Sequence, residues 1–256
     1  PRFRRAVEDW VEAGVLAPWP AAGDDAFVPI PDASALGAHL AADLAPATGV
    51  RIEALDRDAR GWTLTDDDGA GHGPFDALVL ALPPTQASAL LRDAGAQALA
   101  ERLAEHPAEP CWTALVQAPE AGAPFDLLAP DAGAIALAVR EDAKPFRDTE
   151  GCFTFHAHAD WSRERLEDEP GAVAAALAPA LSTLLDVDVA PERVTVHRWR
   201  YARMADPAHP EALWDAALRI GCCGDWLTEG GDVEGAWLSG AALAGRLLGS
   251  DLEAGD

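Results

Sequence analysis

The segment at residues 220–239, IGCCGDWLTEGGDVEGAWLS, constrains the fold more than any other part of this 256-residue chain. A short apolar strand over residues 218–223 ends at Gly224 and Asp225, a glycine-rich loop follows, and a helix begins near Val233. This order predicts a carboxylate at the carboxyl end of a strand, beside the amino end of a helix. Asp225 can accept hydrogen bonds from hydroxyls, and the unpaired N–H groups of the helix end favour a partly anionic atom.

The helix that follows carries small residues at a regular spacing. Ala236, Gly240 and Ala244 are four residues apart, so a helix places them on one face. A stripe of small side chains lets a flat or bulky group approach the backbone closely. The corner formed by the strand end and this helix therefore suits a polar ligand with a planar part.

Several sequence blocks are characteristic in combination. They are FDALVLALP at residues 75–83, HAHADWSRERL at 156–166, HRWRYA at 197–202, CGDW at 223–226 and VEGAWLSG at 233–240. With these blocks the chain resembles the renalase-like flavoproteins of the amine-oxidase superfamily, nearly from end to end. The resemblance implies FAD as the cofactor. It also implies an α/β fold with a Rossmann-like FAD/NAD(P)-binding domain and a substrate domain built on an antiparallel sheet.

The resemblance also implies which residues meet the cofactor. In that family a Gly-Asp pair faces the ribityl chain of FAD, and the next helix directs its amino end at the pyrimidine edge of the flavin. By position, these cofactor-binding residues are Gly224, Asp225, Val233, Glu234, Gly235 and Ala236. Ile52 joins them because it has the spacing of the family strand whose backbone meets the adenine. For Glu234 the sequence supports a second role equally well, because an acidic side chain in the first turn of a helix also interacts favourably with the helix dipole.

One motif that the family uses is missing. No G-x-G-x-x-G turn is present to hold the pyrophosphate, and the nearest stretch, GAGHG at residues 69–73, follows three aspartates and reads as a hairpin turn. We therefore expect an N-terminally incomplete copy that lacks its first βαβ unit. Such a chain should hold FAD weakly or not at all by itself. Flavin absorbance co-purifying in stoichiometric amount would contradict this expectation.

The expected organisation is two interleaved domains. Residues 26–90 and 203–256 form the FAD-binding domain, and residues 1–25 and 91–202 form the substrate domain. Helices are predicted over 3–15, 34–44, 85–103 and 172–185, with Ser34 as an N-cap, and 208–216 is a loop or a short helical turn. Strands are predicted over 27–30, 50–55, 61–64, 77–82, 113–117, 135–139, 152–158 and 194–199. The continuous apolar run at 77–82 is typical of a parallel strand buried on both faces.

Candidates for the substrate pocket are aromatic or basic. Trp112, Trp199 and Trp237 are possible platforms for a nicotinamide-sized ring, with packing in the core as the alternative for each. Lys144 and Arg147 belong to a K-P-F-R stretch that resembles a family K-P-G-R turn, and they offer charge to an anionic substrate. A solvated basic loop is the favoured alternative. Phe146 stands where the family has Gly, which puts the geometry of this turn in doubt because Phe disfavours positive φ.

The histidines and cysteines of the chain are predicted to have structural roles. His156 and His158 are two apart in a predicted strand and have no third ligand at a suitable spacing, so no metal site is expected. The four cysteines form no C-x-x-C pair, and vicinal Cys222 and Cys223 sit in an apolar strand. Buried structural thiols in a reducing, cytoplasmic setting fit this pattern. No hydrolase constellation is present.

The charge balance is strongly acidic, with 43 acidic against 19 basic residues and a net charge of −24. Such a surface repels nucleic acids and anionic membranes, and no run of about 18 apolar residues exists to span a bilayer. Lys144 is the only lysine. This composition is typical of proteins from a salt-rich cytoplasm, and a GC-rich genome explains it equally well.

We therefore expect a flavin-dependent oxidoreductase that acts on a small-molecule substrate. The resemblance implies oxidation of dihydronicotinamides, the NAD(P)H isomers, by hydride transfer to FAD, with O2 as electron acceptor and release of H2O2. No side chain is assigned as catalytic, because the flavin carries the chemistry. Amine or polyamine oxidation and a non-catalytic remnant are the alternatives, and the sequence assigns no oligomeric state.

Overall fold

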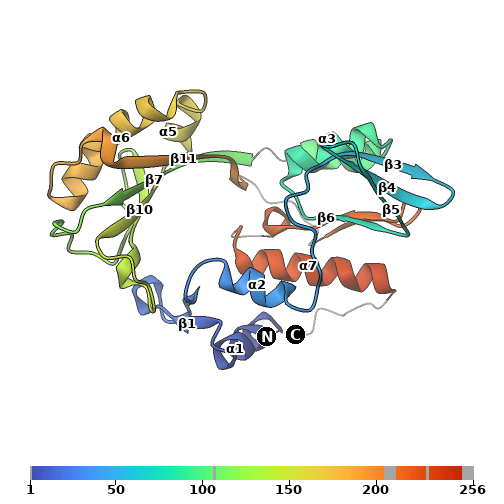
Figure 1. The fold of residues 1–256 in the computed structure, drawn as a ribbon, viewed down its shortest axis with the longest axis horizontal. Helices are drawn as coiled ribbons and strands as arrows, with labels where there is room; N and C mark the ends of the chain where they lie inside the picture. The colour runs from blue at the N-terminus through green and yellow to red at the C-terminus, as the bar shows by residue number, and fades with distance from the viewer. Residues whose placement is uncertain (1, 106–107, 205–211, 229–230, 250–256) are drawn as a thin grey trace. The chain divides into compact units, whose positions relative to one another are not determined.

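The computed structural model describes residues 2–105, 108–204, 212–228 and 231–249, and the chain divides into two compact units (Figure 1). Unit 1 consists of Pro1–Phe3, Pro46–Ala108 and Arg203–Asp256. Unit 2 consists of Arg4–Ala45 and Glu109–Ala202. Each unit combines helices with β-sheet, which confirms the expected mixed α/β class.

Unit 1 is centred on a three-stranded sheet with the order β12-β13-β6, in which β6 (Leu78–Leu80) runs parallel to β13 (Ile220–Cys222) and β12 (Leu213–Asp215) runs antiparallel to it. Helix α7 (Val233–Leu248) packs on one face. A Cβ at Gly221 would come within 2.6 Å of Leu243 Cδ1, so glycine permits this close approach of helix and sheet.

The other face of this sheet is covered by apolar side chains of unit 1. Helices α3 (Pro84–Asp93) and α4 (Gln97–Ala104) contribute Leu91, Leu99 and Leu103 to one core with Leu80. The apolar run at 77–82 was expected to be buried on both faces. That expectation is wrong for Val79, which is 43% exposed because β6 lies at the edge of the sheet.

A meander completes unit 1. Strands β3 (Ile52–Asp58), β4 (Gly61–Asp66) and β5 (Gly71–Phe75) pair antiparallel in sequence order. The β4–β5 turn is held by Asp66, whose Oδ1 accepts hydrogen bonds from the N–H groups of Asp68 and Ala70. This geometry confirms that the glycine-rich stretch at residues 69–73 makes a hairpin and no phosphate loop.

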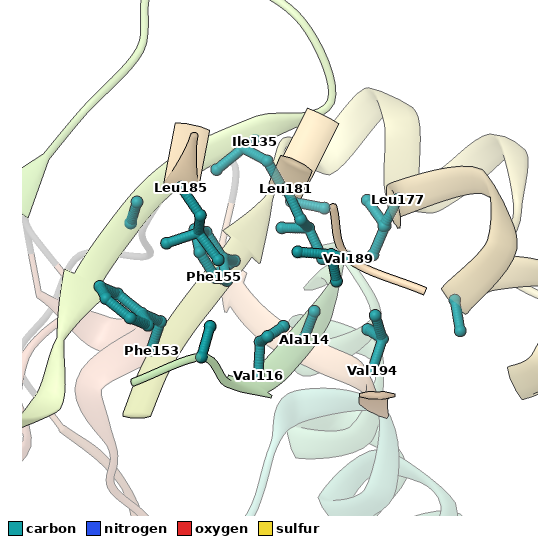
Figure 2. Packing of buried hydrophobic residues seen from close by; sticks show 14 of the residues in the cluster. Ala114, Val116, Ile135, Phe153, Phe155, Leu177, Leu181, Leu185, Val189 and Val194 are labelled. Carbon is teal, nitrogen blue, oxygen red and sulfur yellow. The ribbon is translucent and has the colours of Figure 1, made fainter. Parts of the chain in front are cut away.

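Unit 2 contains a five-stranded sheet with the order β11-β7-β10-β9-β8. Its strands are β7 (Ala108–Gln117), β8 (Leu127–Leu128), β9 (Ile135–Arg140), β10 (Cys152–Ala157) and β11 (Val194–Met204). Figure 2 shows the core between this sheet and α6 (Pro170–Leu185), where Phe155 meets Leu181 and Leu185. The alternating burial along β10 is the period-two pattern that its sequence predicts.

Helix α1 (Arg2–Glu12) begins in unit 1 and continues into unit 2 from Arg4. Unit 2 also contains β1 (Leu16–Pro18), β2 (Phe27–Pro29) and α2 (Ala35–Ala41), and the short helix α5 (Ala159–Glu164) precedes α6. Four 3-10 turns are present in the described chain: η1 (Pro20–Ala22), η2 (Glu141–Ala143), η3 (Pro191–Arg193) and η4 (Asp225–Leu227).

The boundaries of the units differ from the domain boundaries expected from the sequence. Residues 26–45 belong to unit 2, where β2 pairs with β1 in the register Leu16↔Pro29. Residues 91–108 belong to unit 1, since Leu99 and Leu103 of α4 pack into the same core as α3. Both corrections come from tertiary packing. The assignment of one unit to FAD and the other to substrate stays a prediction.

Three local expectations also need correction. The helix expected over 85–103 is two helices, because Gly95 with φ 76° ends α3 before α4 begins. Ser34 does not cap α2 with its side chain, and its Oγ donates instead to Asp32 Oδ1 at 2.6 Å. The loop expected over 208–216 lies partly outside the described residues, and its end forms β12 by pairing with β13. No described helix combines the length and apolar character needed to cross a membrane.

Candidate cofactor-binding site

The strand end at Gly224 is tied directly to helix α7. After β13, the Gly224 N–H donates to Ser239 Oγ at 3.1 Å, and Ser239 is fully buried. A side chain at Gly224 would overlap the indole of Trp226, so only glycine leaves room for that ring. These contacts place Asp225, the first residue of η4, beside the helix, as the sequence predicts for this corner.

The amino end of α7 is capped by its own loop. Asp232 is the N-cap, and its Oδ1 accepts a hydrogen bond from the Gly235 N–H at 2.8 Å. Thr228 Oγ1 donates to the Asp225 carbonyl at 3.0 Å and occupies the space where a Cβ of residue 235 would lie. Gly235 is therefore required by packing against Thr228. Because the Gly235 N–H already donates to the Asp232 carboxylate, it is not available to a ligand, although the sequence alone predicted that it would be.

Several polar groups at this corner have no partner among the described residues. The Trp226 indole N–H is buried, at 4% exposure for the residue, and finds no acceptor in the part of the chain that is described. The half-buried Asp225 carboxylate accepts no hydrogen bond from described residues. The N–H groups of Val233 and Glu234 precede the first intrahelical bond, which the Ala236 N–H makes to the Asp232 carbonyl at 3.0 Å.

This set of groups fits a flavin. A buried indole N–H that lacks an acceptor costs free energy until a ligand supplies one. The corner therefore offers N–H donors for carbonyl or ring-nitrogen acceptors and one carboxylate for hydroxyl groups, which is what a ribityl chain joined to a pyrimidine ring needs. On the helix, Ala236 is exposed, and a Cβ at Gly240 would meet no atom within 4 Å, so the small-residue stripe leaves its face open.

The vicinal cysteines next to this corner are structural. Cys222 is completely buried and Cys223 is 8% exposed, and neither is in a disulfide. Burial raises the pKa of Cys222 to about 12, and the neighbouring Cys223 adds to the shift. Burial also raises the pKa of Cys223. Both thiols therefore stay protonated at neutral pH and supply no thiolate for chemistry.

Ile52 lies elsewhere in unit 1. It begins β3 and lines a groove of about 750 Å³ along β6, together with Leu55 and Leu64. The corner residues do not line this groove. The structure thus gathers six of the seven cofactor candidates at one corner and leaves Ile52 at a second place in the same unit.

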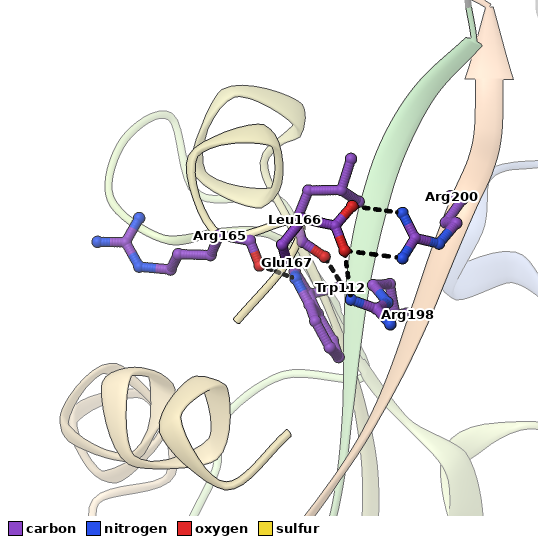
Figure 3. A network of polar contacts seen from close by, with 6 residues as sticks. All are labelled: Trp112, Arg165, Leu166, Glu167, Arg198 and Arg200. Carbon is purple, nitrogen blue, oxygen red and sulfur yellow. Dashed lines mark hydrogen bonds and ion pairs between the residues drawn. The ribbon is translucent and has the colours of Figure 1, made fainter. Parts of the chain in front are cut away.

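Trp112 cannot serve as a substrate platform. It is 1% exposed, and its indole N–H donates to the Arg165 carbonyl at 3.0 Å. Figure 3 shows how the surrounding network is closed by Glu167, which pairs with Arg198 and Arg200. The hydrogen bond from Arg200 lowers the pKa of Glu167. This corrects the prediction for Trp112, because the strand periodicity of β7 turns the residue toward the core.

The other two tryptophans remain accessible. Trp199 on β11 is 52% exposed, and its ring stands edge-on to His197 with the ring centroids 4.3 Å apart. Trp237 on α7 is half-buried and packs against Phe3 at a centroid distance of 5.8 Å. Trp199 therefore presents an open aromatic surface in unit 2, whereas part of the Trp237 ring is covered within unit 1.

The basic candidates already have partners. Both oxygens of Glu141 accept from Lys144 Nζ at 2.8 Å, and the ammonium lies 5.7 Å from the Trp19 ring centroid. Arg147 donates to the Pro31 carbonyl. Phe146 adopts φ 60° and is 74% exposed, so this turn takes the left-handed conformation despite the bulky residue. The structure favours a folded loop over a ready anion site.

His156 and His158 occupy positions typical of structural residues. Thr113 Oγ1 lies 3.0 Å from His156 Nδ1 across the β7–β10 pair, and His158 stands at the N-cap of α5. No group of three or more His, Cys, Asp or Glu side chains in the described residues is arranged to hold a metal ion.

Sequence reasoning missed three contributors to the corner. Asp232 could have been found, since an aspartate directly before a helix is a standard N-cap signal. Ser239 and Thr228 could not, because each acts across a tertiary contact. Trp226 was part of a quoted block, and only its burial reveals its unsatisfied N–H.

Comparison with known proteins identifies a family for most of the chain. Residues 30–248 match the family described as flavin containing amine oxidoreductase. The fold is similar to a structure titled as a protoporphyrinogen oxidase from Exiguobacterium sp. 255-15, with a TM-score of 0.53, 13% identity, and coverage of 78% of this chain and 47% of that one. A putrescine oxidase variant redesigned in cofactor binding gives a TM-score of 0.53, 13% identity, 78% coverage of this chain and 48% of its own.

The chain thus spans about half the length of these two solved structures. Their low identity supports the fold alone, whereas the family match covers most of the chain. That family's flavin implies FAD as the cofactor. The chain belongs to the flavin-containing amine oxidoreductase family.

Proposed function

We propose that the protein is a renalase-like oxidoreductase that oxidises dihydronicotinamides, the NAD(P)H isomers, with FAD as cofactor and O2 as electron acceptor. The observation that carries the proposal is the corner at the end of β13. There Thr228 joins the Asp225 backbone to the amino end of α7, and the Asp225 carboxylate accepts no hydrogen bond from the described residues. The indole N–H of Trp226, which packs in the core with α3 and α4, has no acceptor among those residues either.

When bound, FAD supplies the hydride acceptor for such a substrate. The protein then has three tasks. Asp225 accepts hydrogen bonds from cofactor hydroxyls, and the N–H groups of Val233 and Glu234 with the Trp226 indole hold acceptor atoms. The positive end of the α7 dipole favours negative charge near those acceptors, and the Asp232 carboxylate at the cap offsets part of that effect.

Substrate recognition needs an aromatic surface and no acid or base. Hydride abstraction from an electron-rich dihydropyridine requires no proton transfer by a side chain. The half-exposed Trp199 ring, buttressed by His197, offers a planar ring a stacking partner. Lys144 is paired with Glu141, so it offers little free charge to an anionic substrate.

Amine or polyamine oxidation is the second candidate, and the family description favours it. The two activities are separated by mixing the FAD-loaded protein anaerobically with dihydronicotinamide isomers and, separately, with amines. Loss of flavin absorbance with the isomers and not with amines is the result we expect. Bleaching by amines alone would replace the first proposal by the second, and bleaching by neither would favour the non-catalytic remnant.

A further inference from the structure

The face of the unit 2 sheet that lies opposite α6 is partly open. Side chains alternate along a strand, so β7 directs Ala114 and Val116 into the core that Figure 2 shows. The alternate residues Thr113 and Leu115 therefore belong to the opposite face. Leu115 is 46% exposed there. A reactive side chain on this face can meet a small solute from solvent.

A thiol, an imidazole and a hydroxyl group lie together on this face. Cys111 and Thr113 are two residues apart on β7, and the strand register places His156 of β10 opposite Thr113. Thr113 Oγ1 lies 3.0 Å from His156 Nδ1, and Cys111 Sγ lies 4.0 Å from the same nitrogen. Cys111 and His156 are both partly exposed. One ring nitrogen thus faces both the thiol and the hydroxyl group.

Thr113 fixes the orientation of the imidazole. It is 6% exposed, so its hydroxyl is a buried polar group whose hydrogen bond to His156 is costly to break. A hydroxyl both donates and accepts, so Thr113 can donate to the neutral ring and accept from the protonated one. The Cys111 thiol also lies 3.5 Å from the Trp112 carbonyl oxygen and 3.6 Å from that of Ala157, which hold it beside the ring.

We propose that Cys111 is a peroxide-reactive thiol and that His156 is the base that takes its proton. The sulfur attacks one oxygen of H2O2, so an S–O bond forms as the O–O bond breaks. His156 Nδ1 accepts the thiol proton and returns it to the departing hydroxide, which leaves as water. The sulfur is oxidised by two electrons to a sulfenic acid, and the peroxide is reduced.

Peroxide fits this cluster better than an acyl substrate does. Acyl transfer needs free N–H donors for an oxyanion, whereas β7 and β10 are interior strands whose N–H groups pair within the sheet. Attack on peroxide needs a thiol, a base and access from solvent. The oxidase reaction proposed above releases H2O2, so the source of the peroxide rests on that proposed function. The reactivity of Cys111 does not.

Cys152 is a matched control in the same sheet. It begins β10, is partly exposed like Cys111, and has no hydrogen bond through its sulfur to the residues that the structure describes. In the strand register it lies opposite Gln117, six residues along β7 from Cys111, which is a distance of about 20 Å. The two thiols are therefore too far apart to form a disulfide, and each reports its own surroundings.

The test exposes the full chain without cofactor to H2O2 at pH 7 in the presence of dimedone, which traps sulfenic acids. Mass spectrometry of tryptic peptides follows Cys111 and Cys152 separately. We expect the adduct on Cys111 to form at least about tenfold faster than the adduct on Cys152. This comparison within the unmodified chain needs no variant.

Two variants test the role of the imidazole. His156→Phe should lower the Cys111 rate to that of Cys152 and leave the Cys152 rate unchanged. His156→Gln should give the same loss, because an amide can bond to Thr113 without taking up a proton. Circular dichroism checks that both variants fold.

Three results would overturn the proposal. One is an equal rate at Cys111 and Cys152 in the unmodified chain. Another is a Cys111 rate that His156→Gln preserves, which would show that no proton transfer is involved. The third is an equal slowing of both thiols in the variants, which would assign the effect to the sheet as a whole. The proposed function fails on other evidence, namely FAD-loaded protein that releases no H2O2 with any substrate, and that failure leaves the rate with added H2O2 unchanged.

Discussion

Two glycines of the same helix differ in why they are glycine. At Gly235 the space for a Cβ is already occupied by Thr228 Oγ1, whereas at Gly240 nothing lies within 4 Å. The first glycine therefore serves the junction of η4 and α7. The second lies on the open small-residue face, where packing does not demand it.

This difference predicts opposite effects of one substitution. Gly235→Ala should lower the free energy of unfolding because its methyl group displaces Thr228. Gly240→Ala should raise the free energy of unfolding by about 0.5–1 kcal/mol, since alanine is the better helix former. Urea unfolding of both variants measures the difference. Equal effects of the two substitutions would contradict the packing at Thr228.

The cysteines allow a test of burial. With a pKa raised to about 12, Cys222 has almost no thiolate at pH 8, whereas Cys111 and Cys152 are partly exposed. A maleimide should therefore label Cys111 and Cys152 in the native protein and leave Cys222 unlabelled. All four cysteines should react in denaturant, as mass spectrometry of tryptic peptides can show. Rapid native labelling of Cys222 would mean that β13 is not buried as described.

At the scale of elements, the β4–β5 hairpin depends on one aspartate. His72 Nε2 lies 2.8 Å from Asp66 Oδ2, and two backbone N–H groups donate to the other oxygen of that carboxylate. The hydrogen bond from His72 is the main cause that lowers the pKa of Asp66, and the Ala70 N–H adds to it. The turn is thus built around an ionised carboxylate.

A lowered pKa fixes the direction of the pH dependence. The stability that ionised Asp66 contributes is present above the pKa of an unfolded aspartate, about 3.9, and is lost as the pH falls through the lower folded pKa. Asp66→Asn should therefore destabilise the protein at pH 7, with a difference from the unmodified chain that shrinks in acid. Asp68→Asn serves as the control in thermal unfolding across pH. A difference that grows in acid would refute the role of Asp66.

Elements with a regular apolar pattern follow from the sequence. The period-two burial of β10 and the helices α6 and α7 could be predicted because local pattern and tertiary burial agree. The exposure of Val79 could not, since a parallel strand and an edge strand have the same apolar composition. The break between α3 and α4 at Gly95 depends on how the two helices fold back on each other.

Only part of the candidate site could be predicted from the sequence. Gly224, Asp225 and the start of α7 are adjacent in sequence, so local order places them together. The buried Trp226 N–H depends on tertiary packing and is invisible in a one-dimensional pattern. For Trp112, the sequence shows an aromatic residue in a strand and does not show which face of the sheet meets α6.

At the scale of the whole molecule, charge is the dominant property. A net charge of −24 on 256 residues opposes compaction by self-repulsion, which salt screens. If the composition reflects a salt-rich cytoplasm, the melting temperature should rise as KCl approaches molar concentration. A calorimetric series in KCl measures this, with an uncharged osmolyte as the control. A flat or falling melting temperature would favour the GC-rich genome as the origin of the composition.

Binding of the flavin at the corner between β13 and α7 is tested most directly at the Trp226 indole N–H. FAD is titrated into the isotope-labelled chain, and the indole signals of Trp226 and Trp62 are followed by NMR. Trp62 is the internal control because its N–H already donates to the Leu218 carbonyl at 2.9 Å. If the flavin binds there, the Trp226 signal shifts saturably even at weak affinity while the Trp62 signal does not, and Asp225→Ala binds FAD about tenfold more weakly. FAD binding that leaves the Trp226 signal unchanged, or that is as tight in Asp225→Ala as in the unmodified chain, would show that the flavin does not bind at this corner.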